Sequence, residues 1–265
     1  MADVPETIVS SETTTGLSKV EVIRIDETRI GEAAVEYVPA EAEFKIVVNG
    51  RVETSLHCAP HRIKSLVVGW LMAEGIIERD IDFLAIDTDL DQFVIRVTLS
   101  REAAIALEAR AFTGPIGQFN EPDFPRKVTT ALELKPEQVT DLAQQFKKLF
   151  LGLRSSERMC YLAAFAQNGE IQSYGEGFHR VNALYRALGE LVVAGVAPND
   201  RIALANFGLT RQMTLRLARA GVCMAICAAP PSNAAIEVGN DYYLSIISTA
   251  IGGRITVYSA PWRVV

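Results

Sequence analysis

The stretch Glu176-Gly177-Phe178-His179-Arg180-Val181-Asn182-Ala183-Leu184 decides the fold, because a strand pattern gives way to a helix pattern there. Before it, the short apolar run at residues 159–166 is typical of a buried strand, and Asn168-Gly169 is a turn signal that reverses the chain into a second strand. After it, apolar residues recur at steps of three and four, as on one face of a helix. The junction therefore places an acid, an imidazole, a guanidinium and a carboxamide where helix amides face a cleft. We expect a polar site there; the alternative is that Glu176, His179, Arg180 and Asn182 only cap the helix and pair with one another.

Length and composition limit the classes to which this protein can belong. The 265 residues allow one large domain or two small ones, and 49% hydrophobic residues can fill a sizeable core. A net charge of −6 argues against a broad basic face, so no nucleic-acid partner is expected. No apolar run approaches the roughly 20 residues that span a bilayer, and no signal peptide is visible. The sequence thus predicts a cytoplasmic protein without a membrane segment, preceded by a disordered tail at residues 1–20.

Four cysteines in a chain of this length do not make a disulfide framework. The spacing of Cys223 and Cys227 first suggests a metal pair, but residues 221–228 read as a buried strand, in which four residues span about 13 Å. Two cysteine side chains about 13 Å apart cannot both bind the same metal ion. We therefore expect both cysteines to pack in the core, and no metal site.

The chain divides into two parts of different character. Residues 21–127 predict hairpins, one of them turning at Asn49-Gly50, a helix at about 60–74, and an aperiodic loop at 112–127. A loop of that length is uncommon in a compact domain and is often a lid. Strands and helices alternate through residues 128–265, which is typical of a layered α/β domain.

The junction motif resembles a known family, the formate dehydrogenase accessory proteins (FdhD/NarQ, sulfurtransferases of molybdenum cofactor maturation). The family pattern is Glu-Asp-x-Gly-Arg-His-Asn-Ala; this chain keeps Glu176, Arg180, Asn182 and Ala183 and departs at positions 177, 179 and 181. A second match, at residues 68–77, resembles the family signature Gly-Phe-Leu-x-x-Glu-Gly-Ile. The resemblance covers about residues 20–260.

This resemblance implies a fold, a function and partners. The implied fold is a cytidine-deaminase-like layered mixed sheet with helices, preceded by a smaller β-rich N-terminal part. The implied function is to bind molybdopterin guanine dinucleotide, with GDP as a mimic, and to transfer sulfur to it during formate dehydrogenase maturation. Formate dehydrogenase, a cysteine desulfurase and a second copy of the chain are the implied partners. Zinc-dependent deamination is excluded, since His-x-Glu and Pro-Cys-x-x-Cys are both absent.

The resemblance also assigns the guanine dinucleotide to a segment near the C-terminus, namely Thr249, Ala250, Ile251, Gly252, Gly253 and Arg254. Together with Glu176, His179, Arg180 and Asn182, these residues form the expected cofactor site. Arg180 and Arg254 would pair with phosphate, Asn182 would meet a sugar or base edge, and the two glycines would allow close backbone approach. The alternative is a glycine turn between two strands.

Sulfur transfer needs a thiolate, and here the chain departs from the family. Family members carry Cys-x-x-Cys in the loop corresponding to residues 112–127, which contains no cysteine in this chain. Cys160, which stands where the family has a histidine, is the remaining candidate for catalysis, because Arg158, His179 or Arg180 could favour its thiolate. Two alternatives stay open: Cys160 is buried and inert, or the protein is a scaffold that binds the sulfur donor or the dehydrogenase without catalysis.

Overall fold

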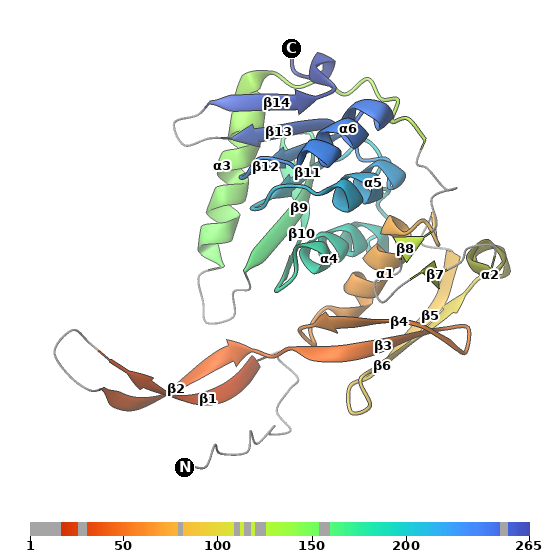
Figure 1. Cartoon of the computed structure of the whole chain (residues 1–265), viewed down its shortest axis with the longest axis vertical. Helices are drawn as coiled ribbons and strands as arrows, with labels where there is room; N and C mark the ends of the chain where they lie inside the picture. Colours follow the sequence, from red (N-terminus) through yellow and green to blue (C-terminus); the bar gives the residue numbers. More distant parts are fainter. Residues whose placement is uncertain are drawn as a thin grey trace.

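The structure is a computed structural model, and it describes residues 17–25, 31–78, 82–108, 112–113, 118–119, 126–153, 160–249 and 254–265. The N-terminal part begins with an antiparallel hairpin of β1 (Leu17–Arg24) and β2 (Glu32–Pro39). A four-stranded sheet of order β4-β3-β6-β5 follows. Its strands are β3 (Ala42–Val48), β4 (Arg51–Cys58), β5 (Phe83–Asp89) and β6 (Val94–Leu99), accompanied by helices α1 (Ile63–Ala73) and α2 (Arg101–Glu108). Figure 1 shows this sheet beside the β1–β2 hairpin, at the bottom of the view.

A six-stranded mixed sheet of order β10-β9-β11-β12-β13-β14 forms the centre of the second part. Its strands are β9 (Tyr161–Gln167), β10 (Glu170–Gly177), β11 (Ile202–Ala205), β12 (Met224–Cys227), β13 (Ser245–Thr249) and β14 (Ile255–Ser259). Strands β11, β12 and β13 run parallel to one another, whereas β9 runs antiparallel to β11 and β14 runs antiparallel to β13. Helix α3 (Pro136–Gly152) covers one side; α4 (Arg180–Val193), α5 (Arg211–Arg219) and α6 (Asn233–Tyr242) cover the other (Figure 1). This confirms the predicted layered α/β architecture, a mixed sheet with helices, behind a smaller β-rich part.

The two predicted hairpin turns are confirmed by their backbone angles. Asn49 and Gly50 have φ of 46° and 83°, and Asn168 and Gly169 have φ of 54° and 80°. Positive φ at both central residues is what a tight two-residue hairpin turn requires, and Asn-Gly meets that requirement at low steric cost.

Helix α1 joins the two parts by packing directly on α4. A Cβ atom added to Gly69 would lie 1.8 Å from the carbonyl oxygen of Tyr185, and one added to Gly189 would lie 1.7 Å from that of Ser65. The helix backbones therefore touch where both side chains are absent. Buried residues of both parts belong to one continuous hydrophobic core. Residues 21–127 and 128–265 thus have separate sheets but a shared core.

The structure differs from the sequence predictions at two boundaries. Strand β1 begins at Leu17, so residues 17–20 belong to a strand rather than to the expected tail. In the expected loop, β7 (Phe112–Thr113) and β8 (Gln118–Phe119) form a short antiparallel pair. Residues 114–117 and 120–125 lie outside the described part, so the lid stays a prediction. None of the described helices is both long and apolar enough to cross a membrane.

Candidate functional site

The described residues predicted as a site are spread along one edge of the six-stranded sheet, called the carboxyl edge below. The carboxyl ends of the parallel strands β11, β12 and β13 lie there. Because β9 runs antiparallel to β11, its first residue Tyr161 also lies at this edge, opposite Gly177 at the end of β10. The end of β13 pairs with the start of β14 through Thr249 and Ile255. Ligands of open α/β sheets commonly bind at such an edge.

The β10–α4 junction occupies one end of the carboxyl edge. His179 Nε2 lies 3.3 Å from Glu41 Oε1, and the guanidinium of Arg180 stacks 5.4 Å from the ring centre of Tyr161. Asn182 is only 3% exposed, and its Nδ2 donates to the carbonyl oxygen of His57 at 2.7 Å. Asn182 thus ties α4 to the end of β4, and its expected contact with a sugar or base edge stays untested. His179, at the N-cap, makes no side-chain capping bond, so the capping alternative does not describe this residue.

A buried arginine, Arg186, stabilises this junction through hydrogen bonds to backbone carbonyl oxygens. Arg186 is fully buried, and its guanidinium donates to the carbonyl oxygens of Glu176 at 2.5 Å and Ala59 at 2.7 Å. Burial lowers the pKa of Arg186 to about 10. His61 Nε2 lies 4.0 Å from Glu176 Oε1, and burial, helped by Arg186, lowers the pKa of His61 to about 4. His61 is therefore neutral at pH 7.

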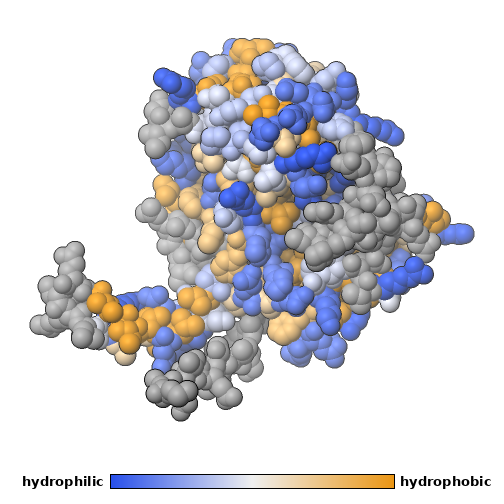
Figure 2. All heavy atoms as spheres, viewed as in Figure 1, coloured by the Kyte–Doolittle hydropathy of each residue, from blue (hydrophilic) through white to orange (hydrophobic). Residues whose placement is uncertain are grey.

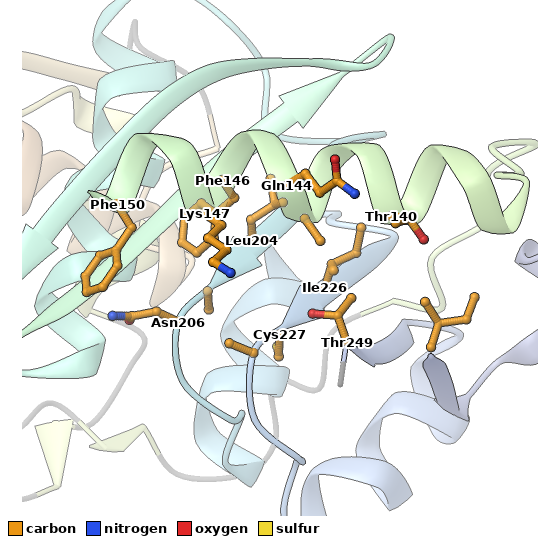
Figure 3. Close-up of a pocket in the computed structure, with 14 residues that line it drawn as sticks. Thr140, Gln144, Phe146, Lys147, Phe150, Leu204, Asn206, Ile226, Cys227 and Thr249 are labelled. Atoms are coloured by element: carbon orange, nitrogen blue, oxygen red, sulfur yellow. The ribbon is translucent and has the colours of Figure 1, made fainter. Parts of the chain in front are cut away.

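A cavity of about 550 Å³ lies between α3 and the carboxyl ends of β11, β12 and β13 (Figure 3). Its walls are mostly apolar and include Phe146, Phe150, Leu204 and Ile226, while Thr140, Gln144, Lys147, Asn206 and Thr249 supply polar groups. Figure 3 shows the Lys147 ammonium and the Thr249 hydroxyl in the space between the helix and the strand ends. A mainly apolar cavity with a few convergent polar groups is the usual form of a small-molecule site.

Cys160 lies next to this cavity and is exposed. The Asn206 amide, which lines the cavity, donates to the carbonyl oxygen of Cys160 at 3.1 Å and accepts from the backbone amide of Leu162 at 2.9 Å. The other three cysteines are buried. Burial raises the pKa of Cys58 and Cys223 to about 11 and that of Cys227 to about 12. Cys160 is thus the thiol of this chain that solvent reaches, which removes the alternative that it is buried.

The remaining expected residues lie toward the other end of the edge. Thr249 lines the cavity, and Arg254 is exposed just before β14. Ala250, Ile251, Gly252 and Gly253 lie outside the described residues. Strands β10 and β14 are the two outer strands of the six-stranded sheet. They are separated by five strand spacings of roughly 4.8 Å, which is about 24 Å. Arg180 and Arg254 are therefore well separated, and a ligand that touches both must be elongated.

Sequence reasoning missed the contribution of α3. Phe146 and Phe150 of this helix line the cavity, although an apolar stripe on a helix usually indicates core packing. No sequence pattern distinguished Lys147, which also lines the cavity, from the other polar residues of the helix. Asn206 had a usable signal, because a carboxamide directly after a buried strand lies at the carboxyl edge of the sheet.

Among the described residues, no group of three or more His, Cys, Asp and Glu side chains could hold a metal ion. The site comprises a mostly apolar cavity with an adjacent exposed thiol, in a mixed-sheet α/β protein. The model of the FdhD/NarQ family matches residues 39–265, and the chain belongs to this family.

Individual relatives are distant but cover almost the whole chain. The chain is 22% identical over 252 residues to the sulfur carrier protein FdhD of Staphylococcus haemolyticus, covering 92% of this chain and 95% of that protein. It is 19% identical over 253 residues to the sulfur carrier protein FdhD of Staphylococcus aureus strain MRSA252, with the same coverage. The crystal structure of a putative formate dehydrogenase accessory protein from Desulfotalea psychrophila superposes with a TM-score of 0.70 at 20% identity, covering 94% of this chain and 99% of that one. This similarity shows a shared fold.

Proposed function

We propose that this protein assists formate dehydrogenase maturation by binding molybdopterin guanine dinucleotide at the carboxyl edge and carrying sulfur to it on Cys160. One observation carries the proposal: a cavity of about 550 Å³ opens at the edge where the one exposed cysteine lies. The names of the relatives, sulfur carrier protein and formate dehydrogenase accessory protein, support the same class of function.

The residues of the cavity fit the guanine nucleotide half of such a ligand. The volume is within the range of roughly 300–1,000 Å³ for small-molecule sites, and Phe146 and Phe150 offer aromatic surface to a base. Lys147 in the cavity and Arg254 beyond it supply positive charge for phosphate. The Thr249 hydroxyl can donate to or accept from a phosphate or sugar group.

The length of the edge fits the rest of the ligand. A nucleotide held between α3 and β13 leaves the edge free from β11 to β10, where Asn206, Cys160 and Arg180 follow in order. A dinucleotide can extend along this line, which a mononucleotide would fill only in part. The pterin half would then lie toward Arg180 and Cys160, which is where sulfur has to be delivered.

Cys160 can carry sulfur by a balanced exchange. Its thiolate attacks the terminal sulfur of a persulfide on a donor such as a cysteine desulfurase. A sulfur–sulfur bond forms on Cys160, the sulfur–sulfur bond of the donor breaks, and the donor cysteine leaves as a thiolate. The buried Cys58, Cys223 and Cys227 offer no comparable route, because their raised pKa values keep them protonated.

One observation favours a second candidate, a scaffold that binds the sulfur donor or the dehydrogenase without sulfur transfer. The segment 112–127 contains no cysteine, although active members of the family place their Cys-x-x-Cys there. Loading of Cys160 by a desulfurase separates the two functions, since only the carrier acquires a persulfide.

Nucleotide binding is tested with GDP on two neighbouring lysines of α3. Lys147 lines the cavity, whereas the adjacent Lys148 is exposed and does not line it. GDP at a hundredfold excess over its Kd should stabilise the parent protein by about 2.7 kcal/mol. Lys147→Ala should weaken GDP binding about tenfold or more by calorimetry, because a charge-assisted contact is lost, and Lys148→Ala should leave it nearly unchanged. Equal effects of the two substitutions would contradict a phosphate contact in the cavity.

A further inference from the structure

The side chain of Asn206 holds the backbone on both sides of the residue that follows Cys160. Its Nδ2 donates to the carbonyl oxygen of Cys160 at 3.1 Å, and its Oδ1 accepts from the backbone amide of Leu162 at 2.9 Å. The backbone amide of Asn206 also donates to the carbonyl oxygen of Leu162 at 3.2 Å. The last paired residues of β9 and β11 are Ala163 and Ala205, so the Asn206 side chain continues the ladder beyond them. The start of β9 is thereby fixed as far as Cys160.

The ring of Tyr161, which lies between these two hydrogen bonds in the chain, is held as well. The ring of Phe207, a residue that is 3% exposed, meets it edge to face, with the ring centres 5.7 Å apart. The guanidinium of Arg180 lies 5.4 Å from the centre of the same ring. Both contacts favour one placement of Tyr161 and so of the adjacent Cys160. Once its backbone is fixed, a cysteine thiol can occupy only a few staggered positions about a single bond.

Asn206 also forms part of the cavity wall, so the place at which it holds Cys160 bears on any ligand there. Figure 3 shows its side chain at the same end of the cavity as Phe150. The carboxamide thus touches both the space that a ligand would fill and the backbone that carries the exposed thiol. Reacting atoms must be close and aligned, and a misplacement of about 1 Å can slow a reaction about a hundredfold.

We propose that Asn206 is a positioning residue for sulfur transfer, because it fixes Cys160 at the rim of the cavity and presents the thiol in one orientation. This inference rests on the proposed function, since it takes Cys160 as the sulfur carrier. Asn206 forms no bond to the transferred sulfur and acts through the backbone of Cys160. The role needs a donor and an acceptor on one side chain, which a carboxamide combines and an ionised carboxylate does not.

Three substitutions separate positioning from a general loss of structure. Asn206→Leu keeps the approximate size of the side chain and removes both of its hydrogen bonds. Asn206→Asp keeps the bond from the Leu162 amide and loses the bond to the Cys160 carbonyl oxygen, because a carboxylate only accepts. Asn199→Leu makes the same chemical change at an exposed carboxamide before β11 and serves as the control. Circular dichroism checks that each variant remains folded.

Fluorine NMR tests the fixing of Cys160 without any ligand or sulfur donor. A thiol reagent with a trifluoromethyl group is attached to Cys160 of the native protein, in which the other three cysteines are buried. The parent and Asn199→Leu should each give one narrow resonance. Asn206→Leu should give a broad resonance or several, and Asn206→Asp an intermediate spectrum. Parental spectra for both Asn206 variants would overturn the proposal.

Loading by a cysteine desulfurase that carries a persulfide tests the effect on sulfur transfer. In this step the Cys160 thiolate attacks the terminal sulfur, the sulfur–sulfur bond of the donor breaks, and the donor cysteine leaves as a thiolate. The maximal rate should fall about tenfold or more in Asn206→Leu and by less in Asn206→Asp, because the thiol loses its orientation. The desulfurase concentration at half-maximal rate should not change, because the donor still meets the same surface.

Two results of the loading experiment have different meanings. An unchanged maximal rate in Asn206→Leu, or a change only in the half-maximal concentration, would overturn the positioning role. A parent protein that takes up no sulfur would instead contradict the proposed function, and the fluorine spectra would still decide whether Asn206 fixes Cys160.

Discussion

Glu74→Gln should cost more stability than any exposed charge substitution, because Glu74 anchors a buried network between the two parts of the molecule. Its side chain is 3% exposed, and Oε1 accepts from Arg216 Nε of α5 at 2.6 Å and from the Tyr185 hydroxyl of α4 at 2.9 Å. Burial raises the pKa of Tyr185 well above its usual value, so the phenol keeps its proton and donates. Removing the carboxylate charge leaves Arg216, itself 7% exposed at the side chain, as a buried cation that has lost its anionic partner.

The expected loss is about 3–5 kcal/mol, which is the usual cost of removing one partner of a buried ion pair. For a chain of this size that corresponds to a lower Tm by about 10 °C. The matched control is Glu36→Gln, which removes the exposed Arg24–Glu36 pair at 2.9 Å and should cost no more than about 1 kcal/mol.

Guanidinium unfolding followed by tryptophan fluorescence measures both variants. The chain has two tryptophans: Trp70 in α1 is buried, and Trp262 near the C-terminus is half exposed. Trp70→Phe and Trp262→Phe each leave one reporter, in the second part and the first part respectively. Because the parts share a core, both reporters should give the same midpoint. A Glu74→Gln loss below about 1 kcal/mol would contradict a buried ion pair at Glu74, and separate transitions for the two tryptophans would contradict a shared core.

Two further predictions concern single residues. A thiol reagent should label Cys160 in the native protein much faster than Cys58 or Cys227, because only Cys160 is exposed; mass spectrometry of peptides reads this out, and equal rates would contradict it. In the folded protein the pKa of His61 is lowered to about 4, so between pH 6.5 and 4 the unfolded chain binds a proton at this histidine that the folded chain does not. The free energy of unfolding of the parent should therefore fall as the pH drops from 6.5 to 4. It should fall by up to about 3 kcal/mol more than that of His61→Gln, which lacks this group. Above pH 6.5 the difference should be constant, and parallel urea-derived curves at all pH values would contradict the assignment.

Local patterns predicted most of the secondary structure because each had a local physical cause. Asn-Gly fixed two hairpin turns, and the change from strand to helix periodicity located α4 close to its true start at Arg180. The β1–β2 hairpin was harder to predict, since its strands alternate only loosely. Figure 2 shows hydrophobic residues along this hairpin. Its apolar residues Ile23, Val35 and Tyr37 are exposed, so the usual link between an apolar residue and the core did not apply.

The positions of several candidate residues could be predicted. Cys160 and Arg180 were chosen at a strand start and a strand-to-helix junction, and Thr249 from the family resemblance; all three lie at the carboxyl edge, while their roles stay predictions. Sequence reasoning could not show that Asn182 is buried against His57, since those residues are distant in sequence. Nor could it place Lys147 in the cavity, because amphipathic periodicity says which face of a helix is apolar and not what that face encloses.

The proposed function requires that a guanine nucleotide bind between α3 and the carboxyl ends of β11, β12 and β13, beside Cys160. A crystal structure of the protein with GDP tests it most directly. We expect GDP in this cavity, with its phosphates near Lys147 or Arg254 and Cys160 still exposed on the same edge of the sheet. GDP bound elsewhere on the molecule, or an empty cavity in crystals saturated with GDP, would contradict it.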